Sequence, residues 1–152
     1  MYQRILVPLD GSELAECALS HVKNLVRTGC AEEVVLLNVF WALTYPLVAG
    51  EPSASYITQI IRSASSASRK YLAGVQSRLS ADGIPVKMES LEDDRPGAAI
   101  SDYAQKNGVD LIIMGTHGYT GLKKMMLGSV AIEVLQNSRL PVLLIRAESC
   151  AK

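Results

Sequence analysis

The sequence predicts an α/β fold, in which helices cover both faces of an open parallel sheet. Short apolar runs alternate with stretches of helical periodicity along the whole chain, in the order β-α-β-α-β-α-β-α-β. Two of the runs, 34–40 and 110–114, are almost continuously apolar, which is typical of strands covered on both faces. No repeat, linker or low-complexity tract interrupts the alternation. We therefore expect a single domain, 1–152, with right-handed crossovers between parallel strands.

The first part of the chain predicts two strands and the helix between them. The apolar run 5–9 ends in the turn residues Asp10-Gly11-Ser12, which predicts a strand followed by a helix start with Ser12 as its N-cap. Apolar residues then recur at helical spacing over 14–26, and Gly29 ends that helix. The run 34–40 follows as the second strand.

The middle of the chain predicts a long loop, a long helix and a more exposed strand. Prolines and a glycine in 41–55 indicate a loop. Apolar residues at helical spacing from 56 to about 80 predict a long helix, which Asp82-Gly83 ends. The alternating pattern of 86–91 is typical of a half-exposed or edge strand.

The last part of the chain repeats the alternation twice. A short helix is predicted over 98–106, followed by the apolar strand 110–114. A glycine-rich segment then leads into a helix from about 130 to 136. The run 140–145 predicts the final strand, with a proline near its start.

Composition excludes several classes of protein. The 152 residues are 49% hydrophobic and 20% charged, and 15 basic residues balance 15 acidic ones. Zero net charge argues against nucleic acid or an anionic membrane as a partner recognised by bulk charge. Cys17, Cys30 and Cys150 contain no CxxC pair and fit neither a disulfide framework nor a zinc cage. Without a signal-peptide pattern or a membrane-length apolar run, we expect a cytoplasmic protein with no membrane partner.

The segment after the fourth predicted strand is the most informative for function. Gly115 and Gly118 are spaced GxxG, and after nine further residues Gly128-Ser129 precedes a helix. Glycines allow close approach to backbone N–H groups, and a helix N-terminus favours an anion. Lys123 and Lys124 add positive charge, and the segment has no Asp or Glu. This pattern predicts a phosphate site; the alternative is a surface loop whose glycines only turn the chain. No Walker A motif occurs.

The loop after the first strand has the opposite character. Asp10 precedes a helical turn that contains Glu13 and Glu16, so this loop is a poor anion site. A carboxylate there suits ribose hydroxyls or a divalent cation, or it could bond only to its own turn. In a parallel sheet ligands bind beyond the carboxyl ends of strands where the strand order reverses. If the first and fourth strands are neighbours, both loops line one crevice.

These residues carry a family resemblance. The chain resembles the single-domain, ATP-binding type of universal stress protein over essentially its whole length. The matching motifs are Arg4-Ile-Leu-Val-Pro8 with Asp10-Gly-Ser12, Leu36-Leu-Asn-Val39, and Asp110-Leu-Ile-Ile-Met-Gly-Thr-His-Gly118, followed by Gly128-Ser129. The resemblance implies a Rossmann-like sheet of strand order 3-2-1-4-5. One motif departs from it: Asp94-Arg95-Pro96-Gly97 stands where members often carry Gly-x-Pro-Ala.

The resemblance also implies a binding site. Asp10 would meet the ribose, the backbone of Val39 the adenine, and His117 and its neighbours the ribose and phosphates. The implied cofactor-binding residues are Pro8, Leu9, Asp10, Val39, Met114, Gly115, His117, Gly118, Gly128, Ser129 and Val130. The implied ligand is ATP, with AMP or ADP as alternatives, and Mg²⁺ could accompany the phosphates. A homodimer through the last strand, Val142 to Arg146, is implied as well.

The expected function is that of an ATP-binding stress-response sensor or regulator with little or slow hydrolysis. No catalytic residue is assigned, and a metal site is left undecided. The alternative is an ATP-hydrolysing or ATP-using enzyme on the same fold, although HIGH-like and SGGxDS-like loops are both absent. A third reading, a nucleotide-free interaction protein, requires the glycine-rich segment to be incidental.

Overall fold

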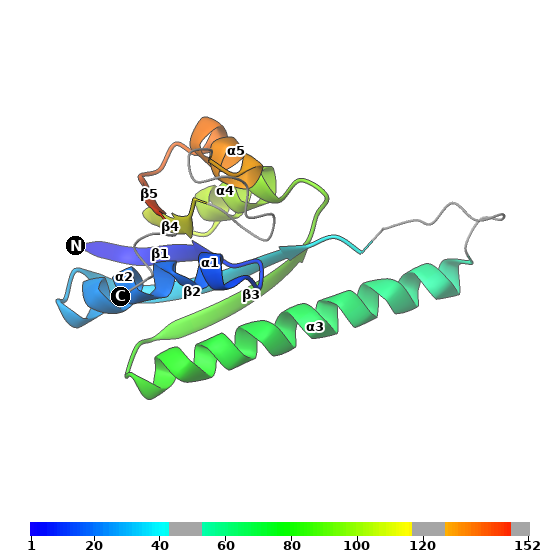
Figure 1. The fold of residues 1–152 in the computed structure, drawn as a ribbon, viewed down its shortest axis with the longest axis horizontal. Coiled ribbons are helices and arrows are strands. Elements are labelled where there is room, and N and C mark those ends of the chain that lie inside the picture. The colour runs from blue at the N-terminus through cyan, green and yellow to red at the C-terminus, as the bar shows by residue number, and fades with distance from the viewer. Residues whose placement is uncertain (43–52, 117–126, 147–152) are drawn as a thin grey trace.

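A computed structural model describes residues 1–42, 53–116 and 127–146 of the chain. The described part contains five strands: β1 (Tyr2–Pro8), β2 (Ala31–Phe40), β3 (Val86–Glu92), β4 (Leu111–Gly115) and β5 (Val142–Ile145). It also contains five helices: α1 (Glu13–Glu16), α2 (Ala18–Arg27), α3 (Ala54–Ala81), α4 (Pro96–Lys106) and α5 (Ser129–Asn137). Strands and helices alternate as the apolar pattern predicts, and Figure 1 shows their arrangement.

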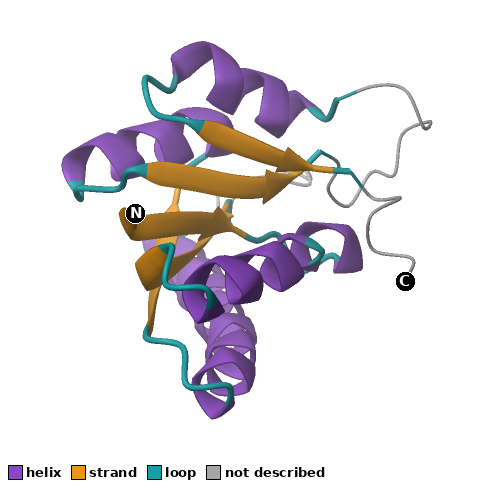
Figure 2. Ribbon diagram, turned by 90° about the vertical axis from the view of Figure 1, so that its left-hand side faces the viewer, coloured by secondary structure: helices purple, strands orange, loops and turns teal. Residues whose placement is uncertain are grey.

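The five strands form one parallel sheet of order β3-β2-β1-β4-β5. In the register of its centre, Leu6 of β1 pairs with Val35 of β2 on one side and with Ile112 of β4 on the other. Helices lie on both faces of the sheet (Figure 2). The predicted fold class and the strand order implied by the resemblance are therefore confirmed.

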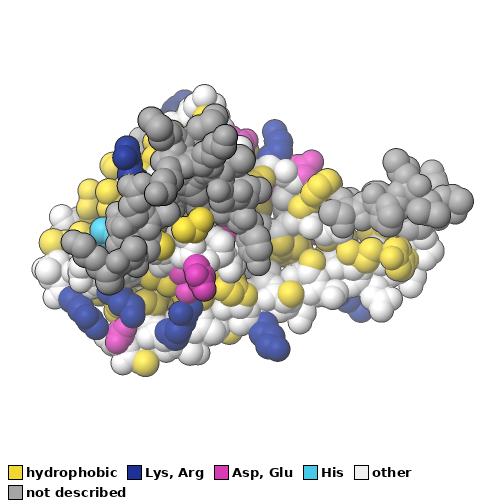
Figure 3. Space-filling model, in the orientation of Figure 1, with side chains coloured by type: hydrophobic (Ala, Val, Ile, Leu, Met, Phe, Trp, Pro, Cys, Tyr) yellow, Lys and Arg dark blue, Asp and Glu magenta, His cyan; other side chains and the backbone are white. Residues whose placement is uncertain are grey.

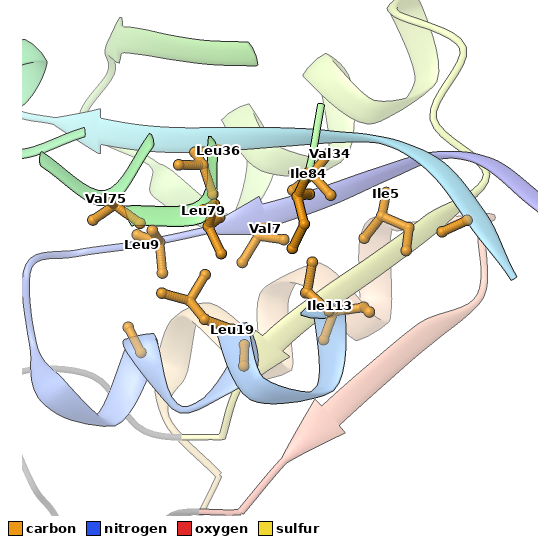
Figure 4. Packing of buried hydrophobic residues seen from close by; sticks show 14 of the residues in the cluster. Ile5, Val7, Leu9, Leu19, Val34, Leu36, Val75, Leu79, Ile84 and Ile113 are labelled. Carbon is orange, nitrogen blue, oxygen red and sulfur yellow. The ribbon is translucent and has the colours of Figure 1, made fainter. Parts of the chain in front are cut away.

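Alternate residues of β1 enter two separate cores, as the two-residue period of a strand requires. Ile5 and Val7 are fully buried in a cluster with side chains of α1, α2 and α3, part of which Figure 4 shows. Leu6, equally buried, belongs to the second cluster, with side chains of α4 and α5. The sheet is thus covered by α1, α2 and α3 on one face and by α4 and α5 on the other.

Helix α3 is longer than the sheet that it covers. Its buried residues, Ser68, Leu72, Val75 and Leu79, all lie in its C-terminal half. The N-terminal half extends beyond the sheet (Figure 1), where hydrophobic side chains are visible on the surface (Figure 3). Ser53 caps this end of α3, because its side chain accepts a hydrogen bond from the backbone N–H of Tyr56.

The structure corrects two predicted element boundaries. The single helix expected over 14–26 is divided at Cys17 into α1 and α2. The helix expected from residue 98 begins two residues earlier, with Pro96 in its first turn. Proline suits that position because its missing N–H would have no partner within the helix. The segment 94–97, although it departs from the family pattern, therefore still begins a regular helix.

Cysteine pairing is a third correction. Cys30 is free and exposed, but Cys17 is disulfide-bonded, a pairing that the wide spacing of the cysteines does not predict. Over residues 1–42, 53–116 and 127–146, no group of three or more His, Cys, Asp and Glu side chains could hold a metal ion. No helix in the same ranges is long and apolar enough to cross a membrane.

Candidate functional site

A cavity of about 290 Å³ lies at the carboxyl ends of β1, β2 and β4. This is the switch point of the sheet, because β1 pairs with β2 on one side and β4 on the other. The strand that follows β1 in the sequence, β2, lies on one side of this point, and the strand that follows β4, β5, lies on the other. The lining residues are Pro8, Leu9, Asp10, Ala15, Leu37, Val39, Pro96, Ile100, Met114, Gly115, Thr116, Gly128, Ser129, Val130 and Ala131.

The cavity brings together nine of the eleven residues that the resemblance implies. These nine are Pro8, Leu9, Asp10, Val39, Met114, Gly115, Gly128, Ser129 and Val130. The other two, His117 and Gly118, lie outside the described residues, as do Lys123 and Lys124. The crevice expected between the first and fourth loops is therefore present in the described part of the chain.

The turn after β1 holds Asp10 in a defined position. Oδ1 of Asp10 accepts hydrogen bonds from the backbone N–H of Ser12 at 2.9 Å and from its hydroxyl at 2.5 Å. The Ser12 hydroxyl oxygen in turn accepts from the backbone N–H of Ala15 at 3.1 Å and caps α1, as predicted. Gly11 completes the turn with φ of +86°, a conformation that glycine adopts without strain. Asp10 thus bonds to its own turn and also lines the cavity.

The two ends of the glycine-rich segment meet at the opposite side of the cavity. The N–H of Gly128 donates to the carbonyl of Thr116 at 2.8 Å, and the N–H of Thr116 donates to the carbonyl of Ile145 at 2.9 Å. These bonds place the start of α5 directly beside the end of β4. Ser129 and Val130 occupy the first turn of α5, where backbone N–H groups have no acceptor within the helix.

Gly128 does not need the backbone freedom of a glycine. Gly128 has φ of −64° and ψ of 152°, an extended conformation open to any residue. Backbone freedom therefore does not require glycine there. What remains is the second property of glycine, namely that the missing side chain leaves room for a ligand to approach the first turn of α5.

The cavity has a polar asymmetry. Among its described lining residues, Asp10 is the only titratable side chain. The first turn of α5 contains no acidic residue, whereas the first turn of α1 contains Glu13 and Glu16. The asymmetry separates an acidic side near β1 from a side with outward-facing amides near α5, as the sequence predicts.

The carboxylate of Glu16 bonds to side chains of α3 and does not line the cavity. Its carboxylate accepts hydrogen bonds from the hydroxyl of Tyr71 at 3.0 Å and from the guanidinium of Arg78 at 2.7 Å. Burial raises the pKa of Tyr71 well above its usual range, and the negative charge of Glu16 raises it further. Tyr71 therefore stays protonated as a donor, and Glu16 acts as a link between α1 and α3.

Six residues that line the cavity are outside the predicted set, namely Ala15, Leu37, Pro96, Ile100, Thr116 and Ala131. Pro96 and Ile100 line it from α4, which nothing in their local pattern indicates. Asn38 does not line the cavity, but its buried amide donates to the carbonyl of Leu9, which does. Two sequence signals could have drawn attention to it, namely a single asparagine inside an otherwise apolar run and its place in the family motif 36–39.

The strand order and the cavity at the switch point define a doubly wound, Rossmann-like α/β protein with room for a small ligand. The comparison with known proteins makes this class specific. The model of the universal stress protein family matches residues 1–146, and the chain belongs to that family. The universal stress protein MJ0577 of Methanocaldococcus jannaschii is similar at 33% identity over 160 residues, which cover 98% of each chain.

Solved structures agree with this assignment. The structure of the Methanocaldococcus protein MJ0577 matches with a TM-score of 0.81 at 35% identity, over 96% of both chains. A universal stress protein in complex with cAMP matches with a TM-score of 0.61 at 22% identity, over 96% of this chain and 98% of its own. A family protein from Arabidopsis thaliana with AMP bound matches with a TM-score of 0.66 at 15% identity, over 95% and 91%. At these lower identities the likeness shows the fold alone.

Proposed function

We propose that this universal stress protein is an adenine-nucleotide-binding domain, 1–152, that acts as a sensor or regulator in the stress response. The observation that carries the proposal is the cavity at the switch point, which joins the Asp10 turn to the first turn of α5. The nucleotides named in two structures of the same fold, cAMP and AMP, support an adenine nucleotide as the ligand class. The cytoplasmic location expected from the sequence stays a prediction.

In the proposed complex, each part of the nucleotide meets the side of the cavity that suits its chemistry. The carboxylate of Asp10 accepts hydrogen bonds from ribose hydroxyls, and the backbone of Val39 meets the adenine. The phosphates lie against the amides of Ser129 and Val130, where the dipole of α5 favours negative charge. His117 and Gly118 complete the phosphate side. ATP is the proposed ligand, with AMP or ADP as alternatives and Mg²⁺ as a companion of the phosphates.

The test uses the room that Gly128 leaves. Because its φ and ψ suit any residue, Gly128→Val strains the backbone little and places a branched side chain where phosphate would approach. Calorimetry should show ATP affinity falling by at least about tenfold, or about 1.4 kcal/mol. Gly74→Val is the matched control, since a Cβ on Gly74 of α3 has no atom within 4 Å. Unchanged affinity in a folded Gly128→Val protein would refute the phosphate assignment.

The proposed protein holds ATP rather than consuming it rapidly. Fast hydrolysis needs a group that orients the attacking water and cations that neutralise the γ-phosphate. Asp10 is the one carboxylate among the described lining residues, and it is engaged by its own turn at the ribose side. We expect phosphate release well below about 1 per second, the low end for enzymes. Multiple turnovers per second, abolished by Asp10→Ala or His117→Ala, would favour the alternative of an ATP-using enzyme.

We also propose a homodimer through the last strand, Val142 to Arg146. Among the described residues β5 is the last strand of the sheet, and an edge strand can pair with another chain through its backbone groups. Leu143 on this strand is 40% exposed, and Leu135 of α5 is 43% exposed. Val142 and Leu144 instead pack against the second core cluster, so Leu143 is the side chain that a partner would contact.

A further inference from the structure

Three polar side chains form a hydrogen-bonded chain beneath the Asp10 turn. The amide Nδ2 of Asn38 on β2 donates to the carbonyl of Leu9 at 2.7 Å. The hydroxyl of Ser68 on α3 donates to Oδ1 of Asn38 at 2.6 Å, and its oxygen lies 2.6 Å from the hydroxyl oxygen of Ser90 on β3. Asn38 is 9% exposed and Ser68 is 6% exposed, so these two side chains are buried between the sheet and α3, whereas Ser90 is half-buried.

The donors and acceptors of this chain determine its direction. A serine hydroxyl has one proton, and that of Ser68 goes to Asn38. Ser90 must therefore donate to Ser68. The carbonyl of Leu9 can only accept, so it sets the Asn38 amide with its nitrogen toward Leu9 and its oxygen toward Ser68 on α3. A flipped amide would turn its oxygen toward the Leu9 carbonyl and leave that carbonyl without its bond from Asn38, and buried groups left without partners destabilise the fold.

Strand β2 bonds both backbone polar groups of Leu9, the N–H and the carbonyl. Its N–H donates to the carbonyl of Leu37 at 2.8 Å, and its carbonyl accepts from the next residue of β2, Asn38. A peptide unit is planar, so fixing the carbonyl of Leu9 also fixes the N–H and the Cα of Asp10. The bond from Asn38 thus continues the hold of β2 on β1 for one residue past the end of that strand, up to the cavity.

We propose that Asn38, held by its bond from Ser68, is a positioning residue for the ribose side of the cavity. This inference rests on the proposed nucleotide-binding function and assigns one part of it to residues that touch no ligand. Asn38 holds the Leu9–Asp10 peptide, and that peptide aims the Asp10 carboxylate, which lines the cavity. Since displacement of a binding group by about 1 Å loses much of its effect, the network should control recognition of the ribose hydroxyls in particular.

The experiment compares two ligands, ATP and 2′,3′-dideoxy-ATP, which lacks both ribose hydroxyls. Asn38→Asp has nearly the same shape, keeps an acceptor for Ser68 and replaces the donor to Leu9 with an oxygen. Ser68→Ala leaves Asn38 in place but removes the hydrogen bond that holds its amide oxygen. The matched control is Gln76→Glu, because the Gln76 amide also donates from α3 to a backbone carbonyl, that of Val86, at the opposite end of the sheet.

We expect the unmodified protein to bind ATP about tenfold more tightly than 2′,3′-dideoxy-ATP, about 1.4 kcal/mol. Asn38→Asp should bind ATP about as weakly as the unmodified protein binds 2′,3′-dideoxy-ATP. Its affinity for 2′,3′-dideoxy-ATP itself should not change. Ser68→Ala should move the ratio in the same direction, and Gln76→Glu should leave it unchanged. Ser68→Ala decides the question if Asn38→Asp does not fold.

Four results would overturn the inference in different ways, the last together with the proposed function. An unchanged ratio in the folded variants would show that Asn38 does not position the ribose side. An equal loss for both ligands would show a general structural role. If the unmodified protein binds both ligands equally, the ribose role fails while nucleotide binding stands. If it binds neither, the proposed function itself is wrong.

Discussion

Replacing Gly97 by alanine should destabilise the protein, although such a change in a helix ordinarily stabilises it. Gly97 lies in the first turn of α4 and is buried against α5. A Cβ added at this position would lie 2.5 Å from the Cβ of Glu133 and 2.5 Å from its Oε2. The carboxylate could rotate away, but the Cβ of Glu133 is attached directly to the backbone of α5.

The size of the effect follows from that contact. Ordinary carbon contacts lie near 3.5–4.0 Å, so α4 and α5 would have to separate by about 1 Å. Overpacking of this kind destabilises proteins by about 1–3 kcal/mol. The opposing gain in helix propensity is at most about 1 kcal/mol and is smaller in a first turn. We therefore expect a net loss of about 1–2 kcal/mol in the free energy of unfolding.

Urea denaturation of three variants tests this reasoning. Gly74→Ala is the matched control, because an added Cβ there has no atom within 4 Å and should stabilise α3 by up to about 1 kcal/mol. Glu133→Ala should fail to rescue Gly97→Ala, since it removes the carboxylate but keeps the Cβ. A Gly97→Ala protein as stable as Gly74→Ala would refute the close contact between α4 and α5.

Three further predictions concern other parts of the molecule. Hydrogen bonds from Lys87 and, to a smaller extent, Arg4 lower the pKa of Glu33 below 4.5, so the stabilisation by this carboxylate is present above pH 4.5 and is lost as the pH falls further. Glu33→Gln should therefore lower the free energy of unfolding at pH 7 by less than about 1 kcal/mol, and in acid the variant should become as stable as the unmodified protein in urea titrations. Tyr71→Phe removes the bond to Glu16 and should lower the free energy of unfolding by about 1 kcal/mol in thermal melts. Leu143→Lys should convert a dimer to monomers in sedimentation, and a monomeric unmodified protein at micromolar concentration would exclude the proposed interface.

Local pattern was sufficient for much of the candidate site. Asp10 follows an apolar run, and Ser12 is a good N-cap, so the turn between β1 and α1 was predicted with its capping bond. Gly128-Ser129 was expected just before a helix, and α5 begins at Ser129. These features depend on a few consecutive residues, which is why the chain alone indicates them.

Contacts between distant residues were not accessible in this way. The break between α1 and α2 at Cys17 interrupts a continuous apolar stripe, and nothing in that stripe predicts it. The sequence shows a glycine at position 97 where family members often have alanine, but it does not show why. The reason is Glu133 of α5, a helix more than thirty residues later, which leaves no room for a Cβ at position 97. The predicted strand order came from the family resemblance, since periodicity does not determine which strands are neighbours.

The sequence by itself determined the alternation of strands and helices, the two chemically distinct loops and the family. Only the tertiary structure decided that nine of the eleven implied residues line one cavity, and that Asn38 holds the carbonyl of Leu9 from below. The physical reason is the range of the interactions. Apolar periodicity and helix capping act within one or two turns of chain, whereas a cavity and a buried hydrogen bond exist only after β1, β2 and α3 have packed together.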